Sequence, residues 1–258
     1  MAVRVVTYNI HCAIGVSRVP RIRAIAQVLR ALEPDVIGLN EVVRTPILAD
    51  QPALLGRMLG MEHSFQRTTR SHGMAFGNAV LVRGSILAGC GAMLSEGPLS
   101  ETAPLGSTPP ASGPSAGMPP RGVEPRGLLL VDARVDGHRF VFGSTHLAPH
   151  PEARAHQMRT LAAYLANKSR SEVPFVLAGD FNAQPHALAP LRELLELAKP
   201  QATYPSQSPR TAIDHVFFSN HWRCTRAFAV PAPASDHAAL VVDLEPATAS
   251  RRGGSSVY

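Results

Sequence analysis

Acidic, amide and imidazole side chains recur where short apolar runs of the sequence end, and together these side chains could do chemistry. The runs are rich in β-branched or aromatic residues, which is typical of buried strands. Because strand ends can converge on a single rim of a layered fold, we expect one pocket to collect these groups. They are Asn9 and His11 after residues 3–8, Glu41 after 36–39, His146 after 140–142, Asp180 and Asn182 after 175–177, Asp214 before 216–218, and Asp236 and His237 before 239–244.

This set of residue types suits the hydrolysis of phosphate esters. Carboxylate oxygens are the ligands that Mg²⁺ or Mn²⁺ prefers, and such an ion polarises a phosphoryl oxygen. A carboxylate or an imidazole can accept a proton from an attacking water, and His and Asn donors can stabilise the developing charge. The sequence contains no cysteine cluster, no His-Glu-x-x-His motif and no P-loop, which argues against a zinc enzyme and a P-loop nucleotidase. We therefore predict a phosphoesterase that uses Mg²⁺ or Mn²⁺.

The elements that must position these residues alternate irregularly along the chain. Two further apolar runs, at residues 79–82 and 128–131, also predict strands. Helical spacing of apolar residues appears in three segments: residues 22–32, a segment after Pro151 with Leu161 and Leu165, and residues 188–195. Several consecutive strands have no helix between them, so two packed mixed sheets with helices outside fit better than a regular βαβ array.

The chain length predicts one domain, which we place at residues 1–245. The stretch from 97 to 127 holds eight of the 23 prolines, together with many Gly and Ser residues. We interpret residues 98–120 as a loop inserted between two strands, functional or, with better support, disordered. We also expect residues 246–258 to form a disordered tail.

The composition is that of a soluble globular protein, with 45% apolar and 17% charged residues. The net charge of +6 would attract polyanions or anionic membranes, although a coding bias towards Arg explains it equally well. Three scattered cysteines do not predict a disulfide framework. No signal peptide and no membrane-spanning run is recognisable, so we expect a cytoplasmic protein without an obligate protein partner.

Seven segments of the sequence resemble, in order, those of the endonuclease/exonuclease/phosphatase superfamily, whose members are similar to deoxyribonuclease I. Within it, the small bacterial subgroup is the most similar. The resemblance extends over about residues 3–244 and implies a four-layer α/β/β/α sandwich. The matching segments are residues 7–11 (TYNIH), 35–41 (DVIGLNE), 77–81 (GNAVL), 144–147 (STHL), 179–182 (GDFN), 213–217 (IDHVF) and 235–237 (SDH).

The resemblance also implies roles for the residues that lie in these segments. Glu41 would be the principal ligand of Mg²⁺ or Mn²⁺, supported by Asn9, and Asp236 would contribute to a second metal position. Asp180 would orient or deprotonate the attacking water. The remaining roles concern the phosphate. Asn182 would hold it, and His146 would donate to one of its nonbridging oxygens. His237 would touch the phosphate or act as base, with its tautomer fixed by Asp214, and further phosphate contacts would come from Arg126, His11 and Asn78.

Two positions depart from the pattern of the family. Asn40 stands where the family usually has Gln, which keeps the amide but shortens the side chain, so we expect small effects. His11 stands where some nucleases have an acidic metal ligand, which favours the small bacterial subgroup. For Arg126 and His11, an ordinary surface or structural role is a close alternative.

The substrate is open at this point. Nucleic acid is the leading class, on the basic charge balance and the family. Aromatic residues are scarce at 5%, and no dense basic run lies near the motifs. A phospholipid headgroup or another small phosphodiester or phosphomonoester is therefore the alternative substrate. A binding module of the same fold without catalysis is the more remote alternative.

Overall fold

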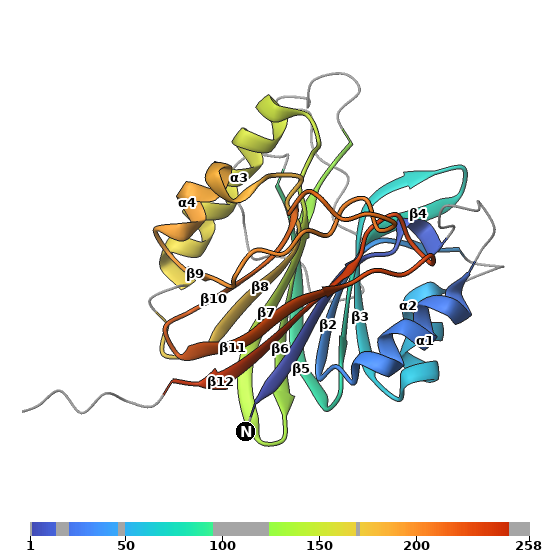
Figure 1. The fold of residues 1–258 in the computed structure, drawn as a ribbon, viewed down its shortest axis with the longest axis horizontal. Helices are drawn as coiled ribbons and strands as arrows, with labels where there is room; N and C mark the ends of the chain where they lie inside the picture. Colours follow the sequence, from blue (N-terminus) through green and yellow to red (C-terminus); the bar gives the residue numbers. More distant parts are fainter. Residues whose placement is uncertain (1, 14–20, 46–49, 95–123, 169–170, 248–258) are drawn as a thin grey trace, which may run out of the picture.

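Two six-stranded β-sheets pack face to face in the computed structural model of the chain, with α-helices on both outer faces (Figure 1). The structure describes residues 2–13, 21–45, 50–94, 124–168 and 171–247. Both sheets contain parallel and antiparallel pairs. The expected four-layer α/β/β/α sandwich of two mixed sheets is thus confirmed.

The first sheet has the order β11-β12-β1-β2-β4-β3, and the second has the order β5-β6-β7-β8-β10-β9. The strands are β1 (Val3–Asn9), β2 (Val36–Arg44), β3 (Glu62–Ser71), β4 (Met74–Val82), β5 (Ser85–Met93), β6 (Gly127–Val135), β7 (His138–His146), β8 (Phe175–Asp180), β9 (Glu196–Leu197), β10 (Asp214–Phe218), β11 (Trp222–Val230) and β12 (Ala239–Pro246).

Each outer face is covered by helices that present an apolar side to the sheet. Ile25 and Leu29 of α1 (Ile22–Leu32) and Leu55 of α2 (Gln51–Leu59) pack on the first sheet. Leu161 of α3 (Pro151–Lys168) and Leu191 of α4 (Ala189–Arg192) pack on the second. The predictions of α1 and α3 are confirmed, and α2 was not predicted. The segment predicted as a third helix is a 3₁₀ turn, η2 (Pro185–Leu188), followed by the short α4.

The eight strands predicted from apolar runs are all present, and most extend further than the runs. The four strands that were not predicted are β3, β5, β9 and β11, and these are the four edge strands of the two sheets. An edge strand is covered on fewer sides, so it needs no continuous apolar run: most residues of β3 and β5 are half-buried or exposed. The continuous apolar run by which a buried strand is recognised in the sequence is therefore missing from β3 and β5.

Residues 98–120 lie outside the described residues, so the structure gives no view of the expected insertion. Pro246, the first residue of the expected tail, is the last residue of β12 and pairs with Trp222, whereas residues 248–258 are also outside the described part. Among the described helices, none is long and apolar enough to cross a membrane.

The inner faces of the central strands change from apolar to polar along their length. In β1 the inward residues run Val3, Val5, Thr7 and Asn9, and in β7 Phe140, Phe142, Ser144 and His146 follow the same order; the apolar members pack in the core between the sheets. Side chains alternate between the two faces of a strand, so this order has a period of two. One end of the sandwich is therefore a dry core and the other end a polar site.

Candidate active site

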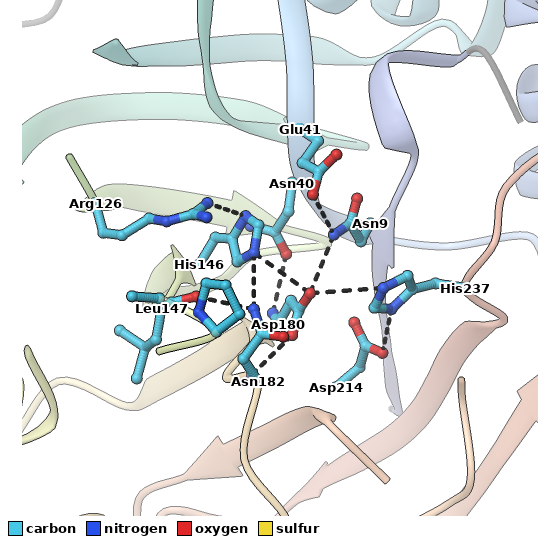
Figure 2. Close-up of polar contacts among 12 residues, drawn as sticks. Asn9, Asn40, Glu41, Arg126, His146, Leu147, Asp180, Asn182, Asp214 and His237 are labelled. Carbon is cyan, nitrogen blue, oxygen red and sulfur yellow. Dashed lines mark hydrogen bonds and ion pairs between the residues drawn. The ribbon is translucent and has the colours of Figure 1, made fainter. Parts of the chain in front are cut away.

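Strand ends from both sheets meet at the polar end of the sandwich. Asn9 is the last residue of β1, His146 of β7 and Asp180 of β8, and Asp214 is the first residue of β10. Figure 2 shows their side chains directed towards a common centre near Asp180. The structure thus brings together residues that are more than 200 positions apart, from Asn9 to His237, as the sequence predicted.

Glu41 reaches this centre because β2 has a bulge at its position. The pairing of β2 with β4 shifts register between Leu39 and Val42, and Glu41 has a positive φ of 53°, which side-chain-bearing residues rarely adopt. Leu39 and Val42 both pack in the core outside the first sheet, although regular alternation would put them on opposite faces. The bulge therefore turns the strand locally at Glu41, and such backbone strain is characteristic of functional sites.

The amide of Asn9 joins the two carboxylates at the centre. Its Nδ2 donates to Glu41 Oε1 at 3.1 Å and to Asp180 Oδ2 at 3.0 Å, while its Oδ1 accepts from the backbone N–H of His11 at 3.0 Å. Asn9 thus holds Glu41 and Asp180 close together by hydrogen bonds.

Asn40 locks the two sheets together beneath the site. Its Oδ1 accepts from the backbone N–H of Asp180 at 3.0 Å, and its Nδ2 donates to the Thr145 carbonyl and to Asn78 Oδ1, both at 2.9 Å. Asn78 in turn donates to the Gly127 carbonyl at 3.0 Å. The amide of Asn78, an expected phosphate contact, is therefore engaged in this buried network. Sequence reasoning gave no positional role to Asn40, because the role depends on strands of the opposite sheet.

Gly179 lets Asp180 approach the neighbouring strand closely. Its φ is 153°, and a Cβ atom at this position would lie 1.8 Å from the carbonyl oxygen of Thr145 in β7. Any larger residue would push β8 away from β7 at the position next to the catalytic candidate. This explains the glycine of the Gly-Asp-Phe-Asn segment in physical terms.

Asp180, Asp214 and His237 form a buried ionisable group. His237 Nδ1 lies 2.8 Å from Asp214 Oδ2, and its Nε2 lies 3.7 Å from Asp180 Oδ2. Burial alone would lower the pKa of His237, but the charge and hydrogen bond of Asp214 raise it to about 9. Burial and the negative charge of Asp214 raise the pKa of Asp180 to about 7. The imidazole is therefore held in its charged form, and the Asp180 carboxyl can exchange its proton near neutral pH.

His146 and Asn182 lie on the other side of Asp180. His146 Nδ1 is 2.7 Å from Arg126 Nη1, and its Nε2 is 3.4 Å from Asp180 Oδ2 and 3.1 Å from Asn182 Nδ2. Asn182 also donates to the Leu147 carbonyl at 2.9 Å, and its backbone N–H donates to Asp180 Oδ1 at 2.8 Å. Burial and the Arg126 guanidinium hold the pKa of His146 well below its usual value, so its imidazole is neutral.

His11 and Asp236 pair with each other at the rim. His11 Nδ1 lies 3.0 Å from Asp236 Oδ1, and their side chains are 47% and 32% exposed. His11, an expected phosphate contact, and Asp236, an expected ligand of a second metal, thus lie outside the buried group of Asp180, Asp214 and His237. Ser235, the neighbour of Asp236, donates to the Asn9 carbonyl at 2.7 Å and ties this rim to β1.

A cleft of about 240 Å³ opens beside the centre, lined by Glu41, Phe76, Asn78, Arg126 and His146 among others. On the side of His237 lies Tyr204, whose ring centroid is 5.0 Å from that of His237 and which is 39% exposed. Sequence reasoning missed Tyr204, because it lies in the irregular segment between β9 and β10, where no periodic signal exists. The cleft and the tyrosine thus lie on two sides of the residues around Asp180.

The donor set at the centre fits a divalent metal ion. One ligand atom each from Asp180, Asp214 and His237 lies within 4.8 Å of the others, and Glu41 adds a third carboxylate through Asn9. The carboxylates outnumber the cationic groups among them, and burial makes the ionised form of Asp180 costly. A hard cation would compensate this excess negative charge.

The sequence matches the model of the Endonuclease/Exonuclease/phosphatase family over residues 6–237. Similar solved structures include an endonuclease/exonuclease/phosphatase from Beutenbergia cavernae (25% identity, TM-score 0.71, 95% of this chain and 72% of that chain). A mannosyl-6-phosphatase from Bacteroides thetaiotaomicron is also similar, with 18% identity and a TM-score of 0.71 over 94% of this chain and 99% of that chain. The human Nocturnin catalytic domain with bound sulfate has 21% identity and a TM-score of 0.69 over 95% of this chain and 94% of that chain. No curated protein matches the sequence.

The raised pKa of His237 predicts a pH-dependent contribution to stability. A folded pKa of about 9, above the unfolded value near 6.5, gives stability that is fully present below about pH 6.5 and lost as pH rises through 9. In urea unfolding with a chelator present, the stability lost in His237→Gln should shrink between these pH values, by up to about 3 kcal/mol.

The substitution His156→Gln, on the exposed side of α3, serves as the control because it removes a histidine away from the group. A difference between wild type and His237→Gln that stays constant from pH 6 to 9.5 would contradict the assignment of a charged imidazole.

Proposed function

The chain belongs to the endonuclease/exonuclease/phosphatase family, whose members hydrolyse phosphoric esters, and from this premise we propose that it is a phosphodiesterase dependent on Mg²⁺ or Mn²⁺. One observation supports the proposal most strongly. The buried Asp180 carboxylate is joined to Glu41 through Asn9 and faces His237 and His146 on either side. Acid, base and anion-stabilising groups thus surround one point.

Glu41 is the residue that would hold the metal ion, and Asn9 would fix its separation from Asp180 by its two hydrogen bonds. Asp214 and His237 are the less suitable pair, because they bond each other at 2.8 Å and the charged imidazole of His237 has no lone pair to offer a metal ion. Asp236 remains our candidate for a second metal position at the rim. A bound Mg²⁺ or Mn²⁺ supplies Lewis-acid polarisation of a phosphoryl oxygen.

Asp180 would accept the proton of the attacking water. Without a metal ion the pKa of this carboxyl is about 7, and a carboxyl that burial makes this basic is well matched to taking a proton. Its orientation is fixed by the backbone N–H of Asn182 at Oδ1 and by Asn9 at Oδ2. The carboxylate therefore needs little reorganisation during the reaction.

The charged His237 would donate from Nε2 to the phosphoryl group, since Asp214 occupies its Nδ1. His146 and Asn182 would donate from the opposite side. Donors that are already in place where negative charge develops lower the barrier most effectively. In this proposal His11 and Asn78 give only peripheral support, since each is engaged with another residue.

Nucleic acid is the substrate class that we propose. The net charge of +6 favours polyanions, and the exposed ring of Tyr204 beside His237 could stack on a base attached to the reacting phosphate. A phosphodiester has two substituents, and the cleft and Tyr204 offer one place for each. The modest volume of the cleft, about 240 Å³, favours the second candidate, a small phosphodiester or phospholipid headgroup.

Replacing Asp180 by Asn should lower kcat for an activated phosphodiester such as bis(p-nitrophenyl) phosphate by about 10²–10⁴-fold. The amide retains the size of the side chain but cannot accept the proton. Removing divalent ions with a chelator should abolish turnover, and adding Mg²⁺ or Mn²⁺ should restore it. Initial rates measured with each ion check both statements.

Asp132→Asn is the matched control, since Asp132 pairs with Arg139 at the surface of the second sheet, away from the site. Undiminished turnover in Asp180→Asn, or in the chelator, would rule out the proposed mechanism.

Replacing Tyr204 by Ala should raise KM for a single-stranded oligonucleotide by about 5–100-fold, the effect of one lost base-stacking contact. Tyr204→Phe keeps the ring and should behave as the wild type. Leu87→Ala, another exposed apolar side chain, is the control. Steady-state kinetics at several salt concentrations provide the measurement.

Binding of a nucleic acid should weaken steeply as salt rises, because counterions are released when phosphates are contacted. A KM that is indifferent both to salt and to Tyr204→Ala would reject nucleic acid in favour of the small phosphodiester.

A further inference from the structure

A buried hydrogen bond joins Arg126 to His146 behind the reaction centre (Figure 2). The Nη1–Nδ1 distance is 2.7 Å, and both residues are almost fully buried, at 8% and 4% exposure. On the proposed function, His146 must present a proton to the phosphoryl group. Which ring nitrogen bears that proton decides whether it can do so.

The guanidinium of Arg126 can only donate hydrogen bonds, and it does not lose its proton in proteins. A short contact to Nδ1 therefore requires a lone pair on Nδ1. In a neutral imidazole, the proton must then lie on Nε2, which faces Asp180 Oδ2 at 3.4 Å. We propose that Arg126 is a positioning residue that fixes His146 in the Nε2–H tautomer.

Asn182 competes with Arg126 for the tautomer. Its Nδ2 lies 3.1 Å from His146 Nε2 and is also only a donor, so this contact favours a lone pair on Nε2. The contact to Arg126 is shorter and charge-assisted, and such hydrogen bonds are roughly twice as strong as neutral ones. Asn182 can also place a hydrogen on the Leu147 carbonyl, at 2.9 Å. The balance therefore favours Arg126.

The competition has a consequence for the site. With Arg126 in place, Nε2–H points towards the Asp180 carboxylate and the oxygens of a bound phosphate, which are acceptors. Without Arg126, no donor would hold a lone pair on Nδ1, and the Nδ1–H tautomer that Asn182 favours, whose Nε2 lone pair faces these negatively charged oxygens, would become populated. The tautomer thus decides between attraction and repulsion at the same point.

Glu124 holds the guanidinium in this position from the mouth of the cleft. Its Oε2 lies 3.0 Å from Arg126 Nη2, and its side chain is 50% exposed. Arg126 is therefore clamped between a surface carboxylate and a buried imidazole. This role, through His146, replaces direct pairing with the substrate phosphate as our assignment for Arg126.

The tautomer can be measured without turnover, by long-range ¹H–¹⁵N correlation NMR of the ¹⁵N-histidine-labelled protein. The His146 signals are assigned by their loss in His146→Asn. We expect a protonated Nε2 and an unprotonated Nδ1 in the wild type. In Arg126→Met, which keeps the unbranched apolar stem of the side chain but has no donor, we expect a population with the proton on Nδ1. Arg126→Lys, which can still only donate, should retain the wild-type pattern.

A wild-type spectrum with the proton on Nδ1 would overturn the proposal, and so would an Arg126→Met spectrum that keeps the proton on Nε2. The wild-type measurement decides the matter alone if Arg126→Met does not fold. Because neither spectrum depends on hydrolysis, failure of the proposed function is recognised separately, in the kinetic measurements on Asp180→Asn.

Kinetics give a second, independent readout. Loss of a group that orients a catalytic side chain typically costs about 10–100-fold in activity, so Arg126→Met should lower kcat by about this factor with little change in KM. Arg139→Met, at the opposite end of β7, is the matched control, since Arg139 pairs with Asp132 at the surface. A rise in KM with unchanged kcat would instead assign Arg126 to direct binding of the substrate phosphate.

Discussion

The structure depends on one costly feature, the burial of the Asp180 carboxylate beside that of Asp214 between two sheets. Two carboxylates at this depth repel each other and lose their hydration, which raises the pKa of Asp180 to about 7. Their neighbours offset part of this cost: Asn9 and the Asn182 backbone donate to Asp180, and His237 is held in its charged form. The remaining excess of negative charge is what makes the site suited to a cation.

The sandwich makes such a site possible because its two ends differ. Along β1 and β7 the inward residues change from Val and Phe to Asn and His, so that the apolar core between the sheets ends where the polar site begins. Asn40 then connects the two sheets at this boundary, through Asp180 and Thr145. The position of Asp180 is therefore set by both sheets, and a small movement of one sheet against the other would displace its carboxylate.

Much of this arrangement could be predicted from the sequence, since apolar runs mark the central strands and polar residues mark their ends. The edge strands were missed because a half-exposed strand needs no apolar period, as in β3. Asn40 and Tyr204 were missed for another reason: their importance lies in contacts with distant strands, not in local spacing. The bulge at Glu41 and the bond from Arg126 to His146 likewise exist only in the folded chain. The roles of the site residues remain proposals.

The central claim is that Glu41 holds a divalent ion beside Asp180 at the polar end of the sandwich. It is tested most directly by crystals soaked in Mn²⁺, whose anomalous scattering locates the ion. We predict a peak within about 2.2 Å of a carboxylate oxygen of Glu41, with further oxygen ligands completing the shell. A peak on Asp214 and His237 that leaves Glu41 without contact, or no peak at saturating Mn²⁺, would contradict the account.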